Sequence, residues 1–206
     1  MLWRLFVLAV VAIGLTYPLL ATKPRLSTRF DTGYKGLNGV AYLDYEPSIV
    51  RNDQGNQEAP TVVQIAEDLP LIEWIRSNVS GNPTIVEWSG DSYDWNSRIA
   101  IHTGLPTLLG WSSHQYQQRQ KYADWILQRR LDIQNFYTEA TQETVTEFLL
   151  TYEVGYVIVG VQEHRFGNPD VLNSFSDHPA LRKVFESDQN TIYSVENDAL
   201  WASSPS

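Results

Sequence analysis

The residues best suited to binding chemistry lie in one window of the sequence, from Glu87 to Trp125. This window holds four tryptophans and three tyrosines, interleaved with acidic, basic, histidine and glutamine side chains. Flat aromatic rings stack on the C–H faces of a sugar, while carboxylate, amide and guanidinium groups bond its hydroxyls. The alternative is that the rings fill a core, as aromatic residues do in ordinary domains. The window predicts a sugar-binding surface whose candidate residues are Asp91, Tyr93, Arg98, Trp111, His114 and Arg119.

Two carboxylates in this window, Glu87 and Asp91, are candidates for an acid–base pair. A glycoside hydrolase needs two carboxyl groups at a defined separation across the bond that it cleaves. Glu87 lies in a β-rich run and Asp91 follows in a glycine turn, and the ligand sites of α/β proteins form in such loops. Two interpretations stay open, a stand-alone glycoside hydrolase and a loop that Asp91 merely caps.

Motifs for metals, cofactors and covalent catalysis are missing from the sequence. The chain has no cysteine, which excludes thiolate zinc sites, iron–sulfur clusters and cysteine nucleophiles. His102 and His114 lack the helical spacing of a metal-binding pair. Gly155 and Gly160 flank a strand instead of forming a phosphate-binding turn, and no Gly-x-Ser-x-Gly motif is present. We therefore predict no metal site and no cofactor.

The charge balance points away from nucleic acid as a partner. The 206 residues include 15 basic and 24 acidic side chains, which give a net charge of −9, and only four of the residues are lysines. A nucleic-acid-binding protein normally carries a strongly basic face. The apolar content of 43% is enough for the chain to bury one hydrophobic core.

The N-terminus predicts a membrane segment. Residues 5–22 are uncharged and would span about 27 Å as a helix, close to the ~30 Å thickness of the hydrocarbon core. Trp3 and Tyr17 lie near its ends, where aromatic rings prefer the membrane interface. A cleaved signal peptide is the alternative, with Arg4 as its charged start and cleavage after Ala21. Because more cations follow the segment than precede it, the charge bias alone favours a cytoplasmic C-terminal part.

Beyond this segment the sequence predicts one α/β domain. We expect a transmembrane helix over 1–22, a connector over 23–60, the domain over 61–196 and a flexible tail over 197–206. Helical periodicity predicts helices over residues 68–79, 123–137 and 145–152. Extended runs predict strands over 84–88, 107–111 and 156–160, and a hairpin of 182–186 with 191–196. Strands that alternate with helices predict a mostly parallel sheet flanked by helices, with an antiparallel hairpin at its C-terminal end.

Several blocks of the sequence together resemble one known family. The blocks are Gly90-Asp91-Ser92-Tyr93, Arg98-Ile99-Ala100, Thr103-Gly104-Leu105-Pro106-Thr107-Leu108-Leu109-Gly110-Trp111, His114, Arg119, Arg130, Asp132-Ile133, Tyr137 and Val154-Gly155-Tyr156-Val157-Ile158-Val159-Gly160. They resemble the C-terminal extracytoplasmic region of the YYY-domain family. Members of that family are polytopic membrane proteins similar to the C-type glycosyltransferases, which use polyprenyl-phosphate sugars. This chain departs from the family pattern in having Gln115 after His114, where the family often has glutamate, and in showing one hydrophobic segment where the family has many.

The resemblance implies a membrane-anchored domain on the extracytoplasmic side of the membrane. Such a domain would help a glycosyltransferase-like membrane protein to bind or position a glycan or a polyprenyl-phosphate sugar. A polytopic membrane subunit would then be its partner and would carry the catalytic carboxylate, so Asp31 is not assigned that role. The alternative is a non-catalytic structural or interaction module that caps a membrane protein.

Overall fold

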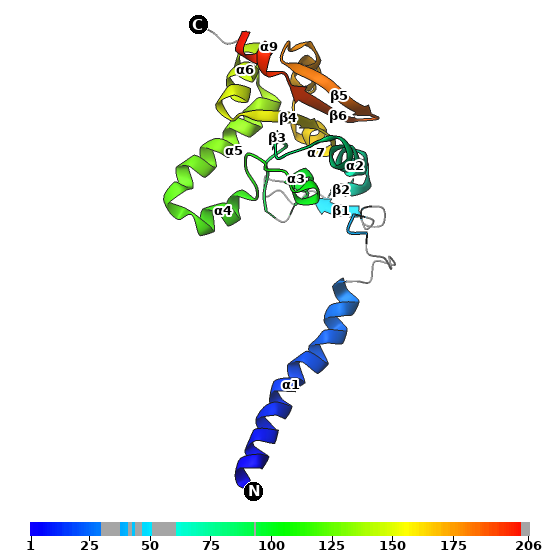
Figure 1. Cartoon of the computed structure of the whole chain (residues 1–206), viewed down its shortest axis with the longest axis vertical. Coiled ribbons are helices and arrows are strands. Elements are labelled where there is room, and N and C mark those ends of the chain that lie inside the picture. The colour runs from blue at the N-terminus through cyan, green and yellow to red at the C-terminus, as the bar shows by residue number, and fades with distance from the viewer. Residues whose placement is uncertain (30–37, 41–42, 44–46, 51–60, 93, 203–206) are drawn as a thin grey trace. The chain divides into compact units, whose positions relative to one another are not determined.

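The computed structural model describes residues 1–29, 38–40, 43, 47–50, 61–92 and 94–202, and it divides into two units, 1–46 and 47–206 (Figure 1). In the first unit, helix α1 spans Leu2–Arg29. Its apolar part, Leu2–Ser27, would be about 39 Å long, which is enough to cross a bilayer. The helix extends past residue 22, where the predicted segment ends.

The second unit is built on a mixed four-stranded sheet. Its strands are ordered β3 (Thr84–Val86), β4 (Val154–Val159), β6 (Asn190–Val195) and β5 (Leu181–Ser187). Strands β3 and β4 are parallel, whereas β4 with β6 and β5 with β6 are antiparallel. The predicted α/β class and the C-terminal hairpin are therefore confirmed, but a mostly parallel sheet is not.

The sheet has less parallel pairing than the sequence predicts because the run 107–111 does not form a full strand. It contributes a single parallel bridge, between Thr107 and Ile85. Pro106 precedes this bridge and has no N–H to donate, although its carbonyl accepts a hydrogen bond from the Ile85 N–H at 2.9 Å. Gly110 and the start of the next helix then end the extended backbone.

Helices surround the sheet, and the predicted periodic segments are helical. They are α2 (Leu69–Asn78), α5 (Ala123–Thr138) and α6 (Gln142–Thr151), the last begun by a capping box in which Thr141 and Thr144 bond each other's backbone N–H. The shorter helices are α3 (Arg98–Thr103), α4 (Ser112–Gln118), α7 (Val161–Phe166), α8 (Pro169–Ser174) and α9 (Asn197–Ala202). The 3-10 turns are η2 (Ile65–Asp68), η3 (Gln120–Tyr122) and η4 (Phe175–Asp177).

Both faces of the sheet are covered, as the buried run in β4 predicts. Alternate residues of β4 point to opposite faces: Val157 and Val159 join the main core with α5, α6 and α8, whereas α2 packs on β5 and β6. Figure 1 shows α2 and α5 on opposite sides of the central strands. The Tyr137 hydroxyl on α5 lies 3.0 Å from the Val86 carbonyl and 2.8 Å from the Ile158 carbonyl, and so ties the helix to both parallel strands.

Regular structure also forms within the predicted connector and the predicted tail. Within the predicted connector, Pro47–Val50 forms strand β1, which pairs with β2 (Thr61–Gln64) in an antiparallel ribbon. In the predicted tail, α9 forms, and Leu200 is buried in the main core. Leu200 therefore serves packing.

Candidate functional site

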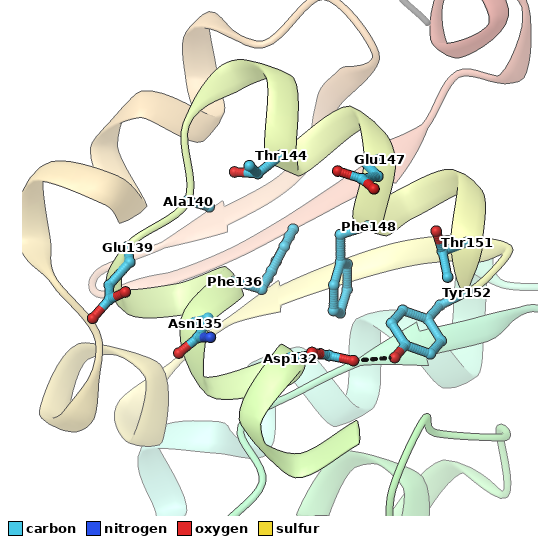
Figure 2. Close-up of a pocket in the computed structure, with 10 residues that line it drawn as sticks. All are labelled: Asp132, Asn135, Phe136, Glu139, Ala140, Thr144, Glu147, Phe148, Thr151 and Tyr152. Atoms are coloured by element: carbon cyan, nitrogen blue, oxygen red, sulfur yellow. Dashed lines mark hydrogen bonds between the residues drawn. The ribbon is translucent and has the colours of Figure 1, made fainter. Parts of the chain in front are cut away.

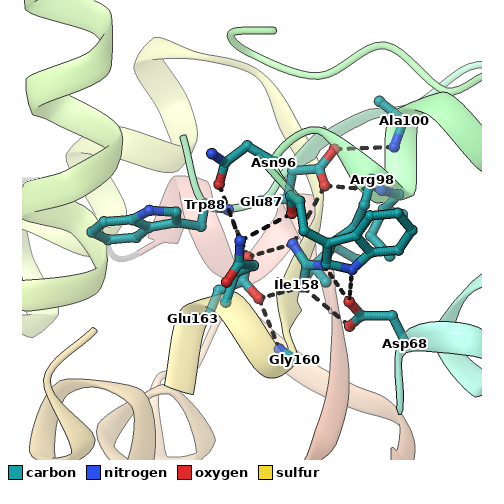
Figure 3. A network of polar contacts seen from close by, with 12 residues as sticks. Asp68, Glu87, Trp88, Asn96, Arg98, Ala100, Ile158, Gly160 and Glu163 are labelled. Atoms are coloured by element: carbon teal, nitrogen blue, oxygen red, sulfur yellow. Dashed lines mark hydrogen bonds and ion pairs between the residues drawn. The ribbon is translucent and has the colours of Figure 1, made fainter. Parts of the chain in front are cut away.

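The carboxyl ends of the parallel strands β3 and β4 meet at a buried cluster of charged side chains (Figure 3). At its centre is Arg98, the first residue of α3. Its guanidinium lies 2.6 Å from Asp68, 2.7 Å from Glu163 and 3.5 Å from Glu87, and all four side chains are completely buried. We call these four residues the Arg98 cluster. Burying charges is unfavourable unless they are paired, and here each carboxylate has a cation within reach.

The carboxylates of the Arg98 cluster also hold the backbone of the loops that follow the strands. Glu87 accepts hydrogen bonds from the Ile99 and Ala100 N–H groups at 2.9 and 3.0 Å, and so caps the first turn of α3. Glu163 accepts from the Trp88 N–H at 2.6 Å and from the Gly160 N–H at 2.9 Å. The cluster therefore fixes the loop after β3 to the loop after β4.

Gly160, at the end of β4, is the point of closest approach to this cluster. A Cβ atom there would lie 2.8 Å from the Asp68 Oδ1 atom and 3.0 Å from a guanidinium nitrogen of Arg98. No other residue type leaves that space, so the glycine is explained by close packing.

Burial and neighbouring charges shift the pKa values of Glu87, Glu163 and Arg98. Burial raises the pKa of Glu87 to about 7, against the lowering effect of Arg98 and of two backbone N–H groups. Burial also acts to raise the pKa of Glu163, but the charge and hydrogen bonds of Arg98 outweigh it and lower that pKa. Burial acts to lower the pKa of Arg98, yet Asp68 and Glu163 hold it well above its usual value. The guanidinium is charged at every accessible pH.

The structure corrects the prediction that Arg98 lies on a binding surface. Its side chain is 0% exposed, and its donors are used by carboxylates that stand 30 and 65 residues away in the sequence. Glu87 is buried in the same way, with both of its oxygens engaged by the backbone. Arg98 and Glu87 therefore stabilise the fold, and a ligand would have to bind to the exposed residues around them.

The remaining predicted site residues lie in different places. The Asp91 carboxylate forms an ion pair with Arg130 of α5 at 2.9 Å, and Tyr93 lies outside the described residues. Trp111 and His114 are brought together, with their rings edge to face at 5.3 Å. The Trp111 Nε1–H donates to the Asn96 carbonyl at 3.2 Å, which fixes the ring to the loop after β3. Arg119, at the C-terminal end of α4, lines a different groove.

Trp111 and His114 line a groove between α3 and α4, which we call the α3–α4 groove. Its volume is about 430 Å³, and its lining residues are Ser97, Ala100, Ile101, Thr107, Gly110, Trp111, His114, Gln115 and Gln118. The hydroxyls of Ser97 and Thr107 are buried in its wall, and among the described residues neither has a hydrogen-bond partner. Ser97 also has a left-handed backbone with φ of 58°. Strain and unsatisfied polar groups are typical of functional positions.

A second groove also borders α4, and Arg119 belongs to it. This α4–α5 groove has a volume of about 370 Å³ and is lined by Leu109, Gln115, Arg119, Tyr122, Trp125, Ile126 and Arg129. The rings of Tyr122 and Trp125 lie 5.6 Å apart. Gln115 lines both grooves, so the two grooves share one residue of α4.

A third cavity, between α5 and α6, involves none of the six predicted sugar-binding residues (Figure 2). It has a volume of about 420 Å³ and a floor of Phe136 and Phe148, whose rings stack at 4.3 Å. Three carboxylates stand around it, and Figure 2 shows one of them, Asp132, bonded to the Tyr152 hydroxyl. The acidic residues are spaced along two separate helices, so no local pattern signals their convergence.

Nothing in the described part of the chain resembles a metal centre, since no three histidine or acidic side chains there converge as metal ligands. The groups that line the two grooves beside α4 include aromatic rings, amides, hydroxyls and guanidinium groups. No protein-family model matches this chain, and no curated protein is significantly similar to it.

Proposed function

We propose that this chain is a membrane-anchored extracytoplasmic domain that binds a glycan or the sugar of a lipid-linked donor in the α3–α4 groove. The observation that carries the proposal is the composition of that groove. It combines the Trp111 ring, the His114 ring, two glutamine amides and two hydroxyls without partners in the described structure. A sugar ring offers C–H faces to stack and hydroxyls that both donate and accept, which matches these groups.

Binding is better supported than catalysis. None of the described residues that line the α3–α4 groove is a carboxylate. Glu87, which a stand-alone glycoside hydrolase would use with Asp91, is fully buried and holds the N-terminus of α3. A general acid must reach the substrate, so this arrangement favours a structural role for Glu87.

The anchor and the assembly are further parts of the proposal. Helix α1 is long and apolar enough to hold the chain in a membrane. The resemblance to the YYY-domain family supports the extracytoplasmic side and a polytopic, glycosyltransferase-like membrane subunit as partner. In that assembly the domain would position the sugar, and the membrane subunit would perform the transfer.

The test compares neighbouring residues of α4 for their effect on sugar binding. The full chain in detergent micelles is applied to an array of neutral oligosaccharides, and affinity for those retained is measured by titration calorimetry. Gln118→Ala removes an amide from the groove, whereas Gln117→Ala removes an exposed amide that does not line it. We expect Gln118→Ala to weaken binding by about three- to tenfold and Gln117→Ala to leave it unchanged. Equal effects, or no oligosaccharide retained by the folded wild-type chain, would contradict the proposal.

A non-catalytic structural module is the second candidate function, and one specific observation favours it. Polar residues that the sequence predicts to bind a ligand are instead paired with other residues of the chain, as in the Asp91–Arg130 ion pair and the Arg98 cluster. The same array distinguishes the two functions, because a structural module would retain no sugar.

A further inference from the structure

The exposed apolar side chains of the second unit are concentrated in one part of the chain. Among its described residues, every large hydrophobic side chain that is exposed lies on or beside α3, α4 and α5. These residues are Ile101, Tyr116, Tyr122, Trp125, Leu127 and Leu131. Trp125 is 74% exposed, far more than a tryptophan that serves packing. Exposed aromatic residues gathered in one place mark an interaction surface.

The same part of the chain is basic, although the whole chain is acidic. From residue 112 to residue 131 there are four cationic side chains and one acidic one, in a protein whose net charge is −9. The cations and rings are interleaved: the Lys121 Nζ lies 4.7 Å from the centre of the Tyr122 ring, which in turn packs on Trp125. Arg119 and Arg129 line the groove beside these rings.

We infer that this face docks on the surface of an anionic phospholipid bilayer. The face consists of Arg119, Lys121, Tyr122, Trp125 and Arg129, and we call it the basic aromatic face. Tryptophan and tyrosine rings prefer the depth of the lipid headgroups, where one end is apolar and the other hydrated. Cationic side chains beside them would contact the lipid phosphates and would be attracted by the negative charge of anionic headgroups. Charge complementarity therefore favours anionic lipid over a neutral or basic partner.

The proposed membrane anchor also favours a bilayer as the partner of the basic aromatic face. This step rests on the proposed anchoring by α1, which would keep the domain within reach of a membrane. Docking would have a consequence for sugar binding, because the groove that Arg119 and Trp125 line shares Gln115 with the α3–α4 groove. The α3–α4 groove would then be held near the headgroups, where the sugar of a lipid-linked donor is found.

The experiment uses the natural lack of cysteine in the chain. A single cysteine is introduced by Gln120→Cys, next to the face, or by Asn173→Cys, an exposed residue of α8, and each is labelled with a nitroxide. The full chain is reconstituted into vesicles of phosphatidylcholine alone or mixed with phosphatidylglycerol. Collision rates of the label with oxygen and with a water-soluble nickel complex report its depth. Carbonate extraction measures anchoring by α1 separately.

We expect the label at residue 120 to lose collisions with nickel in the anionic vesicles only, and the label at residue 173 to stay in water in both. Arg119→Gln combined with Lys121→Gln should lower the ratio of docked to undocked chains by about 30-fold. Arg182→Gln combined with Lys183→Gln, the same charge change on β5, should leave the ratio unchanged.

Three results would overturn the inference. The first is a label at residue 120 that is as accessible to nickel as the label at residue 173. The second is docking that is equal in neutral vesicles or survives the loss of Arg119 and Lys121. The third is spin–spin broadening that grows with protein density, which would assign the face to a second copy of the chain. Failure of α1 to resist carbonate would count against the anchor alone.

Discussion

Replacing Arg98 by methionine removes the only cation from the centre of the Arg98 cluster as the structure describes it. The substitution keeps an unbranched side chain but leaves Asp68, Glu87 and Glu163 buried around an apolar group. Removing one partner of a buried ion pair typically destabilises a protein by about 3–5 kcal/mol. The two shortest ion pairs that the substitution breaks have N–O distances of 2.6 Å to Asp68 and 2.7 Å to Glu163.

The magnitude follows from the lowest-energy state available to the carboxylates that lose their cation, which is the protonated state. Protonating an aspartate or glutamate at pH 7 costs about 4 kcal/mol for each group. Glu87 adds little, because burial already raises its pKa to about 7. With Asp68 and Glu163 both affected, Arg98→Met should lower the free energy of unfolding by about 4–8 kcal/mol. That is comparable with the total stability of an ordinary domain, about 5–15 kcal/mol.

The assay is urea unfolding of the full chain in non-ionic micelles, followed by tryptophan fluorescence. Trp95 is a suitable reporter because its Nε1–H donates to Asp68 at 2.7 Å. The matched control is Arg130→Met, which breaks the partly exposed pair with Asp91 and should cost less than about 1 kcal/mol. Where Arg98→Met alone does not fold at pH 7, addition of Asp68→Asn and Glu163→Gln should restore folding.

The pH dependence of the Arg98→Met effect on the free energy of unfolding provides a second, independent test. Protons become available to the stranded carboxylates below about pH 5, so the difference between Arg98→Met and the wild-type chain should shrink there. A loss of less than about 1 kcal/mol at pH 7, or a loss that does not shrink in acid, would refute the account of the Arg98 cluster as a set of buried ionised pairs.

Three further substitutions test the same framework. In the folded chain Glu87 has a pKa of about 7, against an ordinary value of 4.5. Its contribution to the free energy of unfolding is therefore fully present below pH 4.5 and is lost as the pH rises to 7. Glu87→Gln should remove about 3 kcal/mol of that pH dependence, as measured by urea titrations. Gly160→Ala places a Cβ 2.8 Å from Asp68 and should lower the free energy of unfolding by about 1–3 kcal/mol, whereas an unchanged urea midpoint would contradict the packing argument. Tyr137→Phe removes the hydroxyl that ties α5 to the carbonyls of β3 and β4 and should cost about 1–2 kcal/mol, measured as a shift of the midpoint at constant m-value.

Much of the fold could be predicted because its signals are local. The i, i+3, i+4, i+7 spacing of Val145, Phe148, Leu149 and Tyr152 reports one buried face, and α6 covers Gln142–Thr151. The hairpin is marked by a short polar turn between two alternating runs, and β5 and β6 pair there. The run 107–111 looks equally extended, but strand pairing depends on a neighbour, which a window of sequence does not contain.

The site was harder to predict because its geometry depends on distant partners. A charged side chain is almost never buried unless it is paired, so Arg98 is expected at the surface when its partners are unknown. Its burial depends on Asp68 and Glu163, which no spacing rule connects to it. Asp68 is the N-cap residue of α2, yet its side chain makes no capping bond and instead accepts a hydrogen bond from the Arg98 guanidinium. The pairing of Trp111 with His114 follows from their closeness at the start of one short helix, which explains why that part of the expected surface was brought together.

The spacing of the Arg98 cluster has a consequence for how the chain folds as it is synthesised. Glu163 follows Arg98 by 65 residues, and a ribosome adds roughly 5–20 residues per second, so the last carboxylate arrives on the order of several seconds after the cation. Until then the Arg98 and Asp68 side chains would stay hydrated, and the apolar side chains of α2 stay uncovered until β5 and β6, on which α2 packs, are made. Completion of β4 and α7 therefore permits burial of Arg98, and the hairpin of β5 and β6 then covers α2. A nascent chain arrested before that point would be a substrate for chaperones.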